Sequence, residues 1–437
     1  MKGKFFIIIT FIQITVLILL VNANASDLWQ APFDTTVAKS ESTDSLLSLD
    51  DILVLVAAEN SSFRSFNYQL QAAQNNLKQA GHWPNPEFET ELEEFGWDAS
   101  GFDESEIAIS LAQEFEFFGQ RSARKNVAKS EIDATKLHIK LSAFDLYLET
   151  KQRFYALAHA QQKVELSEAS VALAKEIVDN IYFRLDNGIG LQSEHLLAQL
   201  EQQRSLLALE QAKQDVIVLE SILVSLWKGE PSGVELLTCN NLNLAPLIDK
   251  IDLLSNQIDS TRSIMQLQSE LEILKKEKIL AAAEACPNVM LRGGFKRLTV
   301  DNSKSFHLGI ALPIPLFNRN QGTRRSLDAQ QRSLEYTLEQ SKIEAASVIQ
   351  SHIIQLKKLV DKHAVFDSLL LPTANEAYRK LQNAYESGRV PYIQLLEAKR
   401  ALNDLSFEHN DMLLEIQEQI IALESLTGVT MRTKLEN

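Results

Sequence analysis

The chain is short of the residues that interrupt or cross-link regular structure. Its 437 residues contain only 15 glycines, 10 prolines and two cysteines, Cys239 and Cys286. So little glycine and proline argues against long low-complexity regions, and two cysteines cannot supply a disulfide framework. A helix over residues 251–283 would hold its ends about 50 Å apart, so we expect two free thiols. The composition, 45% hydrophobic, predicts an ordered and mostly helical protein.

Long apolar runs are missing beyond the amino terminus, where a spanning helix would need roughly 20 apolar residues. At the amino terminus, Lys2 and Lys4 precede an apolar run over residues 5–21, and small residues surround Ala25. This pattern is typical of a secretory signal peptide with an A-x-A cleavage site. We predict a signal peptide at residues 1–25 and an extended leader at 26–47. A retained signal anchor is the alternative interpretation.

Basic clusters and enzymatic motifs are also missing. The chain has 43 Lys and Arg against 58 Asp and Glu, for a net charge of −15. Without a basic patch, nucleic acid is excluded as a partner. The sequence has no G-x-S-x-G, no P-loop and no H-E-x-x-H, so we predict neither an enzyme nor a cofactor.

The histidines are scattered, and no H-x-x-x-H pair or paired cysteine ligand accompanies them. Such spacing matches no recognisable zinc or copper site, so the sequence predicts no metal site. The eight histidines are His82, His138, His159, His195, His307, His352, His363 and His409.

The chain does contain a large internal duplication. A strand pair, a very long helix and a helical return after a glycine turn occur twice, with Gly188 and Gly388 at equivalent turns. A repeat of this size defines the architecture. The first repeat spans 48–233, with strands within 87–117 and a tip at 186–190; a connector follows at 234–249. The second spans 250–428, with strands within 288–317, a tip at 386–391, and a tail at 429–437.

The strand pairs alternate with period two, which places apolar and polar side chains on opposite faces. Strands of about 9 to 11 residues with one apolar face suit the wall of an outer-membrane barrel. In the second pair, Arg292 and Lys296 share the polar face. Pro313 and Pro315 are expected at the end of a strand, where the chain turns towards helix. The polar face of the first pair carries Glu87, Glu89, Glu91, Glu93, Glu106, Glu114 and Glu116.

The helices after the strands are longer than a globular core needs. A helix over 121–185 would measure about 100 Å, and a second is predicted over 323–385. Leu137, Leu141, Phe144 and Leu148 follow the four-three spacing of a coiled coil. Return helices are predicted over 192–227 and from the second tip to 426.

Four strands per chain cannot close a barrel, since small barrels need about eight strands. The combination resembles the outer membrane factor (TolC-like) family. The resemblance implies a mainly α protein with a β-barrel portion: a homotrimer whose twelve-stranded barrel lies in the outer membrane of a Gram-negative bacterium and continues as a periplasmic α-helical tunnel.

Three motifs are similar to the heavy-metal (cobalt-zinc-cadmium) resistance branch of that family: W-P-N-P at 83–86, F-E-F-F-G-Q-R at 115–121 and L-P-I-P-L-F-N-R-N-Q-G at 312–322. The branch implies a passive duct for heavy-metal cations in a tripartite resistance-nodulation-division (RND) efflux system. The implied partners are a periplasmic adaptor, an inner-membrane RND pump and outer-membrane lipid. A duct for drugs or type I secretion is the alternative, and a soluble periplasmic coiled-coil scaffold is the alternative from another class.

The resemblance also implies gate residues near the tips: Tyr385 before the second glycine, Gln394 and Glu397 after it, and Glu194 after the first. One acid of the usual pair is replaced by Gln394, and Val390 occupies the place of a gate arginine, with Arg389 one position away. Glu397 would attract cations at a constriction, or it is an ordinary solvated carboxylate. Residues expected to contact the adaptor at the tips are Gly188, Ile189, Leu191, Gly388, Arg389, Val390 and Tyr392.

The acidic strand faces support the hypothesis of a cation-favouring pore. The competing explanation is that barrel interiors are polar whatever the cargo.

Overall fold

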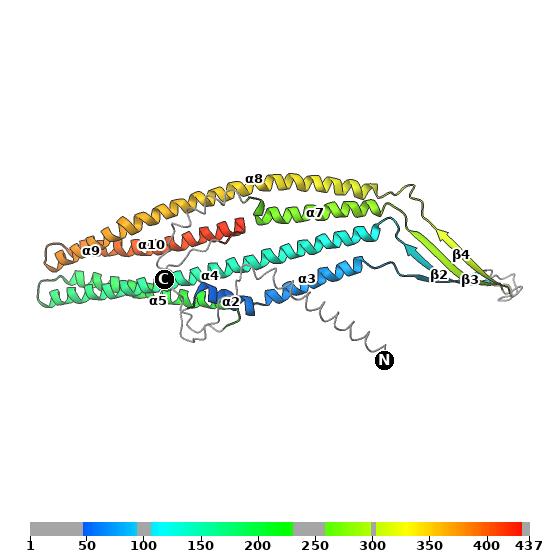
Figure 1. Cartoon of the computed structure of the whole chain (residues 1–437). Helices are drawn as coiled ribbons and strands as arrows, with labels where there is room; N and C mark the ends of the chain where they lie inside the picture. Colours follow the sequence, from blue (N-terminus) through cyan, green and yellow to red (C-terminus); the bar gives the residue numbers. More distant parts are fainter. Residues whose placement is uncertain (1–46, 94–105, 230–257, 299–302, 431–437) are drawn as a thin grey trace, which may run out of the picture. The chain divides into compact units, whose positions relative to one another are not determined.

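A computed structural model describes residues 47–93, 106–229, 258–298 and 303–430 (Figure 1). The predicted signal peptide, the connector, almost all of the leader and Cys239 lie outside the described residues. The described chain divides into two compact units. The helical unit comprises 47–64, 139–229, 258–262 and 342–430, and the sheet unit comprises 65–93, 106–138, 263–298 and 303–341.

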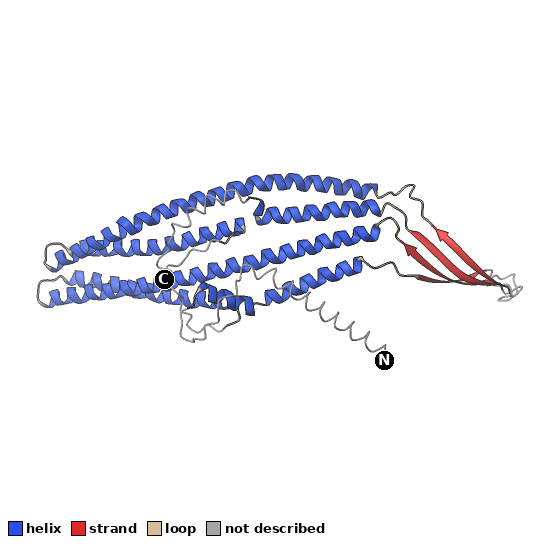
Figure 2. Ribbon diagram, viewed as in Figure 1, coloured by secondary structure: helices blue, strands red, loops and turns tan. Residues whose placement is uncertain are grey.

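Each half of the chain passes from helix through two strands to further helices. Figure 2 distinguishes the helices from the four strands by colour. The first half contains α2 (Leu49–Glu59), α3 (Ser61–Ala80), β1 (Glu87–Glu93), β2 (Glu106–Phe115), α4 (Gln120–Asp186) and α5 (Gln192–Val224). The second contains η2 (Ile258–Ser260), α7 (Arg262–Ala283), β3 (Val289–Leu298), β4 (Lys304–Ala311), α8 (Gln321–Val365), η3 (Phe366–Leu370), α9 (Leu371–Glu386) and α10 (Tyr392–Thr427).

The predicted long helices are present, with one difference. The helix predicted over 121–185 is α4, whereas the helix predicted over 323–385 is divided into α8 and α9 by the π-helix η3. Pro372 explains the interruption, because proline has no N–H and its ring clashes with the carbonyl four residues earlier. The N–H of Leu371 donates to the carbonyl of Phe366, the i→i+5 bond of a π-turn.

Local capping explains where the first helices begin. Asp51 N–H donates to Ser48 Oγ at 3.2 Å, and Ser48 N–H donates to Asp51 Oδ2 at 3.0 Å, which is a capping box. Asn60 separates α2 from α3: its Oδ1 accepts from Ser62 N–H at 2.9 Å. Within the described residues, the helix predicted over 251–283 is observed from Arg262 to Ala283. Cys286 is a free thiol.

The four strands form one antiparallel sheet in the order β1-β2-β3-β4. The central pair joins the two halves of the chain, with Ile109 opposite Phe295, and Phe295 in turn opposite Phe306. The predicted alternation is confirmed on β2, where Ala108, Ser110 and Ala112 are buried and the residues between them are exposed. The exposed apolar face consists of Phe88, Leu92, Ile107, Ile109, Leu111, Leu291, Phe295, Phe306, Leu308 and Ile310.

The strand predicted to reach Phe317 ends earlier, at Ala311. Pro313 and Pro315 lie in the following segment and cannot donate to a strand ladder. The segment leads to Asn320, which adopts a positive φ of 56° and donates from Nδ2 to the carbonyl of Ala281 at 3.0 Å. Helix α8 begins at the next residue.

The helical unit has two hydrophobic clusters. The first joins α8, η3 and α10 through buried residues that include Ile353, Leu356 and Ile416. The second, here called the tip cluster, joins the two helical hairpins: Ile177, Val178, Ile181, Ala198, Tyr378, Tyr385, Tyr392, Leu395 and Leu396. Within the described ranges, none of the helices has both the length and the apolar character needed to cross a bilayer.

Candidate functional site

Both predicted tips are glycine turns of the same geometry. Gly188 has a φ of 73° and Gly388 a φ of 71°, the left-handed region that glycine enters without a Cβ clash. Ile189 N–H donates to Arg184 O at 2.9 Å, and Arg389 N–H donates to Ala384 O at 2.9 Å. These two hydrogen bonds, each between residues five positions apart, end α4 and α9 in the same way.

The side chains around the two tips differ in exposure. Ile189 is 71% exposed and Leu191 is 62% exposed, so the first tip presents apolar surface. At the second tip, Val390 packs against the tip cluster and Arg389 donates from Nε to Ser387 Oγ at 2.9 Å. Tyr392 is only 2% exposed. The expectation that Tyr392 contacts an adaptor is therefore corrected: its side chain packs inside the protomer.

An arginine that the sequence analysis did not single out connects the two tips. The guanidinium of Arg184, in the last turn of α4, lies 4.6 Å from the centroid of the Tyr385 ring. Its Nη1 also donates to the main-chain carbonyl of Tyr385. Nothing in the local sequence pairs these residues, since they are separated by 201 positions.

Burial raises the pKa of the tip-cluster tyrosines above its ordinary value. Tyr385 and Tyr392 pack with ring centroids 6.0 Å apart. Burial, and then the neighbouring Glu201, raises the pKa of Tyr392 to about 12. Burial, and then the charge of Glu194, raises the pKa of Tyr385. The hydroxyls of Tyr378 and Tyr385 are buried without a hydrogen-bond partner among the described residues.

The predicted gate residues thus fall into two environments. Tyr385 is buried and Glu194 is half-buried, whereas Gln394 and Glu397 are exposed on α10. Neither exposed side chain forms a hydrogen bond or ion pair with the rest of the described chain. Lys399, two residues after Glu397 on α10, is 1% exposed, and its Nζ has no hydrogen-bond partner in the described ranges. Burial lowers the pKa of Lys399.

Two basic residues on β3 neutralise part of the acidic sheet face. Arg292 Nη2 lies 2.9 Å from Glu89 Oε2, and Arg292 Nη1 lies 3.8 Å from Glu91 Oε1. Lys296 Nζ lies 3.2 Å from Glu93 Oε2 and also pairs with Glu106.

The remaining three predicted acids differ from one another. Glu87 is exposed on β1, and Glu114 accepts a hydrogen bond of 2.7 Å from the side-chain amide of Asn288. Glu116 follows the end of β2, and its carboxylate is 4% exposed in an ion pair with Arg124. Its assignment to the open polar face is therefore corrected, and six acids and two bases remain there.

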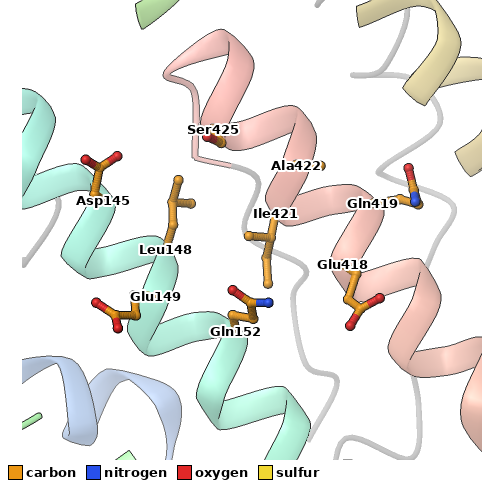
Figure 3. Close-up of a pocket in the computed structure, with 9 residues that line it drawn as sticks. All are labelled: Asp145, Leu148, Glu149, Gln152, Glu418, Gln419, Ile421, Ala422 and Ser425. Atoms are coloured by element: carbon orange, nitrogen blue, oxygen red, sulfur yellow. The ribbon is translucent and has the colours of Figure 1, made fainter. Parts of the chain in front are cut away.

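The helical unit also has an open groove of about 550 Å³ between α4 and α10 (Figure 3). Two of its carboxylates are paired with arginines, Asp145 with Arg262 and Glu149 with Arg153. The groove is lined by Asp145, Leu148, Glu149, Gln152, Glu418, Gln419, Ile421, Ala422 and Ser425.

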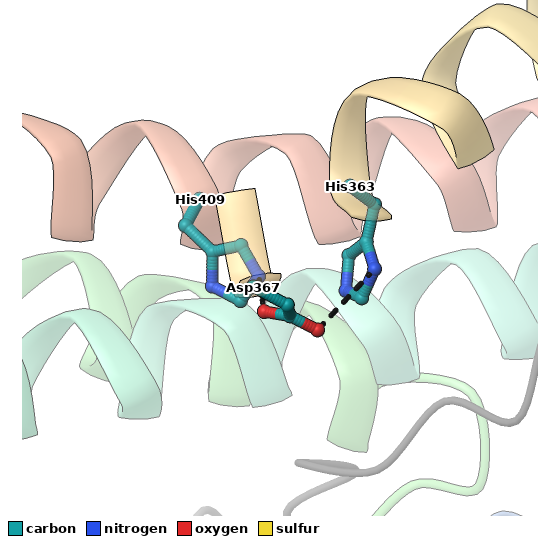
Figure 4. Close-up of side chains that lie close together, drawn as sticks. All are labelled: His363, Asp367 and His409. Atoms are coloured by element: carbon teal, nitrogen blue, oxygen red, sulfur yellow. Dashed lines mark ion pairs between the residues drawn. The ribbon is translucent and has the colours of Figure 1, made fainter. Parts of the chain in front are cut away.

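The structure brings together three potential metal ligands where the sequence predicted none. His363 and Asp367 lie one helical turn apart at the junction of α8 and η3, and His409 approaches them from α10 (Figure 4). Burial lowers the pKa of His409. His363 and Asp367 have H-x-x-x-D spacing, which the expected H-x-x-x-H pattern does not include, and the third potential ligand is distant along the chain.

An amphipathic sheet attached to very long helical hairpins with glycine tips is the architecture of outer-membrane channel proteins. The chain matches the outer membrane efflux protein family over residues 52–227 and 253–429, and it belongs to that family. The resemblance to outer membrane factors is thereby confirmed, as is localisation to the outer membrane. The protein is a channel and not an enzyme.

Its relatives include two resistance proteins. It is 22% identical over 388 residues to the cobalt-zinc-cadmium resistance protein CzcC of Cupriavidus metallidurans, covering 87% of this chain and 90% of that one. It is 24% identical over 339 residues to the nickel-cobalt-cadmium resistance protein NccC of Alcaligenes xylosoxydans xylosoxydans, covering 77% and 76%.

Solved structures share the fold. CusC matches with a TM-score of 0.73 at 15% identity, covering 89% of this chain and 95% of that chain. The outer membrane protein VceC from Vibrio cholerae matches with a TM-score of 0.72 at 16% identity, covering 87% and 96%.

Proposed function

We propose that three copies of the chain form a duct whose twelve-stranded outer-membrane barrel continues as a periplasmic helical tunnel. The four-stranded sheet is the observation that carries this proposal. One face is apolar and exposed, and the outer edges of β1 and β4 have no partner strand in the described chain. Four strands cannot close a barrel, and open edges favour pairing with another copy. Outer-membrane localisation removes the alternative of a soluble periplasmic scaffold.

The duct serves a tripartite RND-type system, in which the helical tips face a periplasmic adaptor. Ile189 and Leu191 support this role, because exposed apolar side chains on a glycine turn are suited to docking. Gly188, Gly388, Arg389 and Val390 belong to the same docking end. An inner-membrane RND pump supplies the energy, and the channel itself is passive.

Heavy-metal cations are the proposed cargo. Two observations support this: the relatives CzcC and NccC are named as metal resistance proteins, and the polar sheet face carries six acids against two bases. In a lumen, such a face attracts cations and repels anions. A duct for drugs or type I secretion has the same fold and remains the alternative.

The gate is proposed at the tip cluster, where Arg184 and Tyr385 join the two hairpins. Splaying the hairpins would widen the opening and would require this contact to break. Glu397 and Gln394 then act as the exposed lining of the constriction, with Glu194 beside the buried Tyr385. The substitution Glu397→Ala should lower the preference of the channel for cations. An unchanged preference would show that Glu397 does not line the constriction.

The cargo is tested in cells and the pore in bilayers. The purified protein should insert into planar bilayers as a cation-preferring pore, and its deletion from a host with its adaptor and pump should increase sensitivity to Co²⁺, Zn²⁺ or Cd²⁺. Anion preference together with unchanged metal sensitivity would refute the metal proposal. Increased drug sensitivity or loss of a secreted protein would favour the alternative duct.

A further inference from the structure

We propose that His363, Asp367 and His409 form a binding site for a divalent first-row transition-metal ion that links α8 and η3 to α10. The site lies entirely within the helical unit and is separate from the acidic strand face. It goes beyond the proposed export function, because the ion held here is a resident ligand of the helices rather than cargo.

The geometry is close to that of a metal site. His363 Nδ1 lies 3.5 Å from Asp367 Oδ2, and His409 Nε2 lies 3.1 Å from Asp367 Oδ1. One potential ligand atom from each of the three residues lies within 4.8 Å of the others. Ligands at the usual distance of about 2.1 Å from a tetrahedral ion stand roughly 3.4 Å apart, so a small inward shift closes the site. The carboxylate of Asp367 is 53% exposed and free to make that shift.

The side chains are tied to elements that position them. His363 and Asp367 share one face of the helix at i and i+4 spacing. Across from them, the ring of His409 stacks on Phe366 with centroids 6.1 Å apart, and Phe366 is buried in the hydrophobic cluster shared by α8 and α10. The two histidine rings lie 5.1 Å apart. Packing therefore fixes the imidazoles, while the more exposed carboxylate provides the adjustment.

One potential ligand atom has no well-aligned hydrogen bond in the described chain. His409 Nε2 is buried, and although it lies near Asp367, the approach is not aligned as a hydrogen bond. A buried nitrogen left in this way costs free energy, and a metal bond to its lone pair would remove that cost. Two imidazoles and one carboxylate leave further coordination positions open to water, a set that suits Zn²⁺, Co²⁺ or Ni²⁺ better than Mg²⁺ or Ca²⁺.

The nearest charges permit a cation. Lys362, next to His363, pairs with Glu408, next to His409, at an Nζ to Oε1 distance of 2.8 Å. This ion pair offsets the lysine charge that would otherwise repel a metal. The pair also joins α8 to α10 beside the site, so the histidines are held near each other without an ion.

A second histidine–aspartate pair provides a matched control. His159 Nε2 on α4 lies 2.9 Å from Asp411 Oδ1 on α10, two residues from His409. No third His, Cys, Asp or Glu in the described ranges joins this pair in a potential metal cluster. If an isolated pair sufficed to bind metal, the two sites would behave alike.

The test uses the full-length protein in detergent after treatment with EDTA. Titration with Co²⁺ should produce visible absorption bands at one site per chain, and Zn²⁺ should remove them by competition. Zn²⁺ should also raise the unfolding temperature, because a ligand that binds only the folded state stabilises it. Mg²⁺ at the same concentration should do neither.

The variants distinguish this site from general binding to an acidic protein. His409→Gln and Asp367→Asn should weaken Co²⁺ binding at least about tenfold and abolish the Zn²⁺-dependent rise, while His159→Gln should match the wild type. Equal Co²⁺ affinity in wild type and variants, or absence of the bands from wild type, would overturn the proposal. Asp367→Asn changes an exposed side chain, so it decides the matter should His409→Gln fail to fold.

Discussion

Lys151 and Glu424 form an ion pair that is almost completely buried in the helical unit. The Nζ of Lys151 lies 2.8 and 2.7 Å from the two carboxylate oxygens of Glu424, and the side chains are 3% and 0% exposed. The residues are 273 positions apart, so the pair joins α4 of the first half to α10 of the second. Both charges are satisfied only when the helices are in register.

Removing one member of this pair should be far worse than removing both. Lys151→Met removes the counter-charge of the buried Glu424 carboxylate and should lower the free energy of unfolding by about 3–5 kcal/mol. The double variant with Glu424→Leu should recover most of that loss, because apolar replacements of a buried pair are often near neutral. Denaturant unfolding of all four proteins in the cycle gives the coupling energy, and additive losses would contradict the prediction.

Replacing the tip glycines by alanine should destabilise the protein only through backbone strain. In Gly388→Ala the new Cβ would have no heavy atom within 4 Å, but the φ of 71° remains unfavourable for alanine. We expect a loss of about 1–2 kcal/mol, and the same for Gly188→Ala. Gly322→Ala is the control: it also has open space but no positive φ, so its stability should hold or rise slightly. Thermal unfolding of the three variants separates strain from packing.

Arg184→Gln should loosen the contact between the tips. The substitution removes the cation–π contact with Tyr385, worth about 0.5–2 kcal/mol, and a charge-assisted hydrogen bond. The measurement is single-channel conductance, with a higher open fraction as the expected result. Arg389→Gln is the matched control, because its Nε donates only to Ser387 at the same tip.

Tyr385→Phe should leave that conductance unchanged, since the hydroxyl forms no hydrogen bond with the described chain. If Arg184→Gln has the same open fraction as the wild type, the two tips are held together by other contacts.

The ion pair of Glu201 and Arg400 should add a pH dependence to stability. Their Oε2 and Nη2 atoms lie 2.8 Å apart, and the hydrogen bond from Arg400 lowers the pKa of Glu201 from 4.5. A carboxyl whose pKa is lower in the folded state stabilises above its unfolded pKa, and that contribution disappears as pH falls through the folded value.

In Glu201→Gln, therefore, the unfolding temperature should fall less steeply on acidification than in wild type. Glu168→Gln serves as the control, because Glu168 is half exposed in its pair with Lys213, and exposed pairs contribute little. Parallel pH profiles for wild type and Glu201→Gln would contradict the prediction.

Arg292→Gln should make the channel more selective for cations. Arg292 is paired with Glu89 and Glu91 on the polar face, so its removal leaves two carboxylates without their counter-charge. The reversal potential in asymmetric KCl should move towards the potassium equilibrium potential. Arg297→Gln removes the same charge from the opposite face of β3 and should shift it much less. Equal shifts would indicate a long-range effect of net charge.

Much of the architecture could be predicted because it depends on local periodicity. Alternation of side chains between the two faces of a strand is a property of the extended backbone, so the acids of β1 and the apolar residues of β2 were assigned to opposite faces correctly. Gly188 and Gly388 could be recognised as turns for an equally local reason, the left-handed φ. The end of β4 was misjudged because the prolines were given a place in the strand rather than beyond it.

The contacts between distant segments could not be predicted in this way. Arg184 beside Tyr385, and His409 beside His363 and Asp367, depend on how far each helix is rotated and shifted against its neighbour. Many registers satisfy the same helical period, and packing of the whole apolar face selects among them. Tyr392 shows the consequence: its position at a tip suggested a docking contact, but packing turned it into the core.

The sequence by itself therefore determined the duplicated order of strands, long helices and glycine turns, because each depends on interactions within a few residues. Only the tertiary structure decided which side chains meet. The buried pair of Lys151 and Glu424 and the cluster of His363, Asp367 and His409 exist because helix packing brings together residues that no local pattern relates.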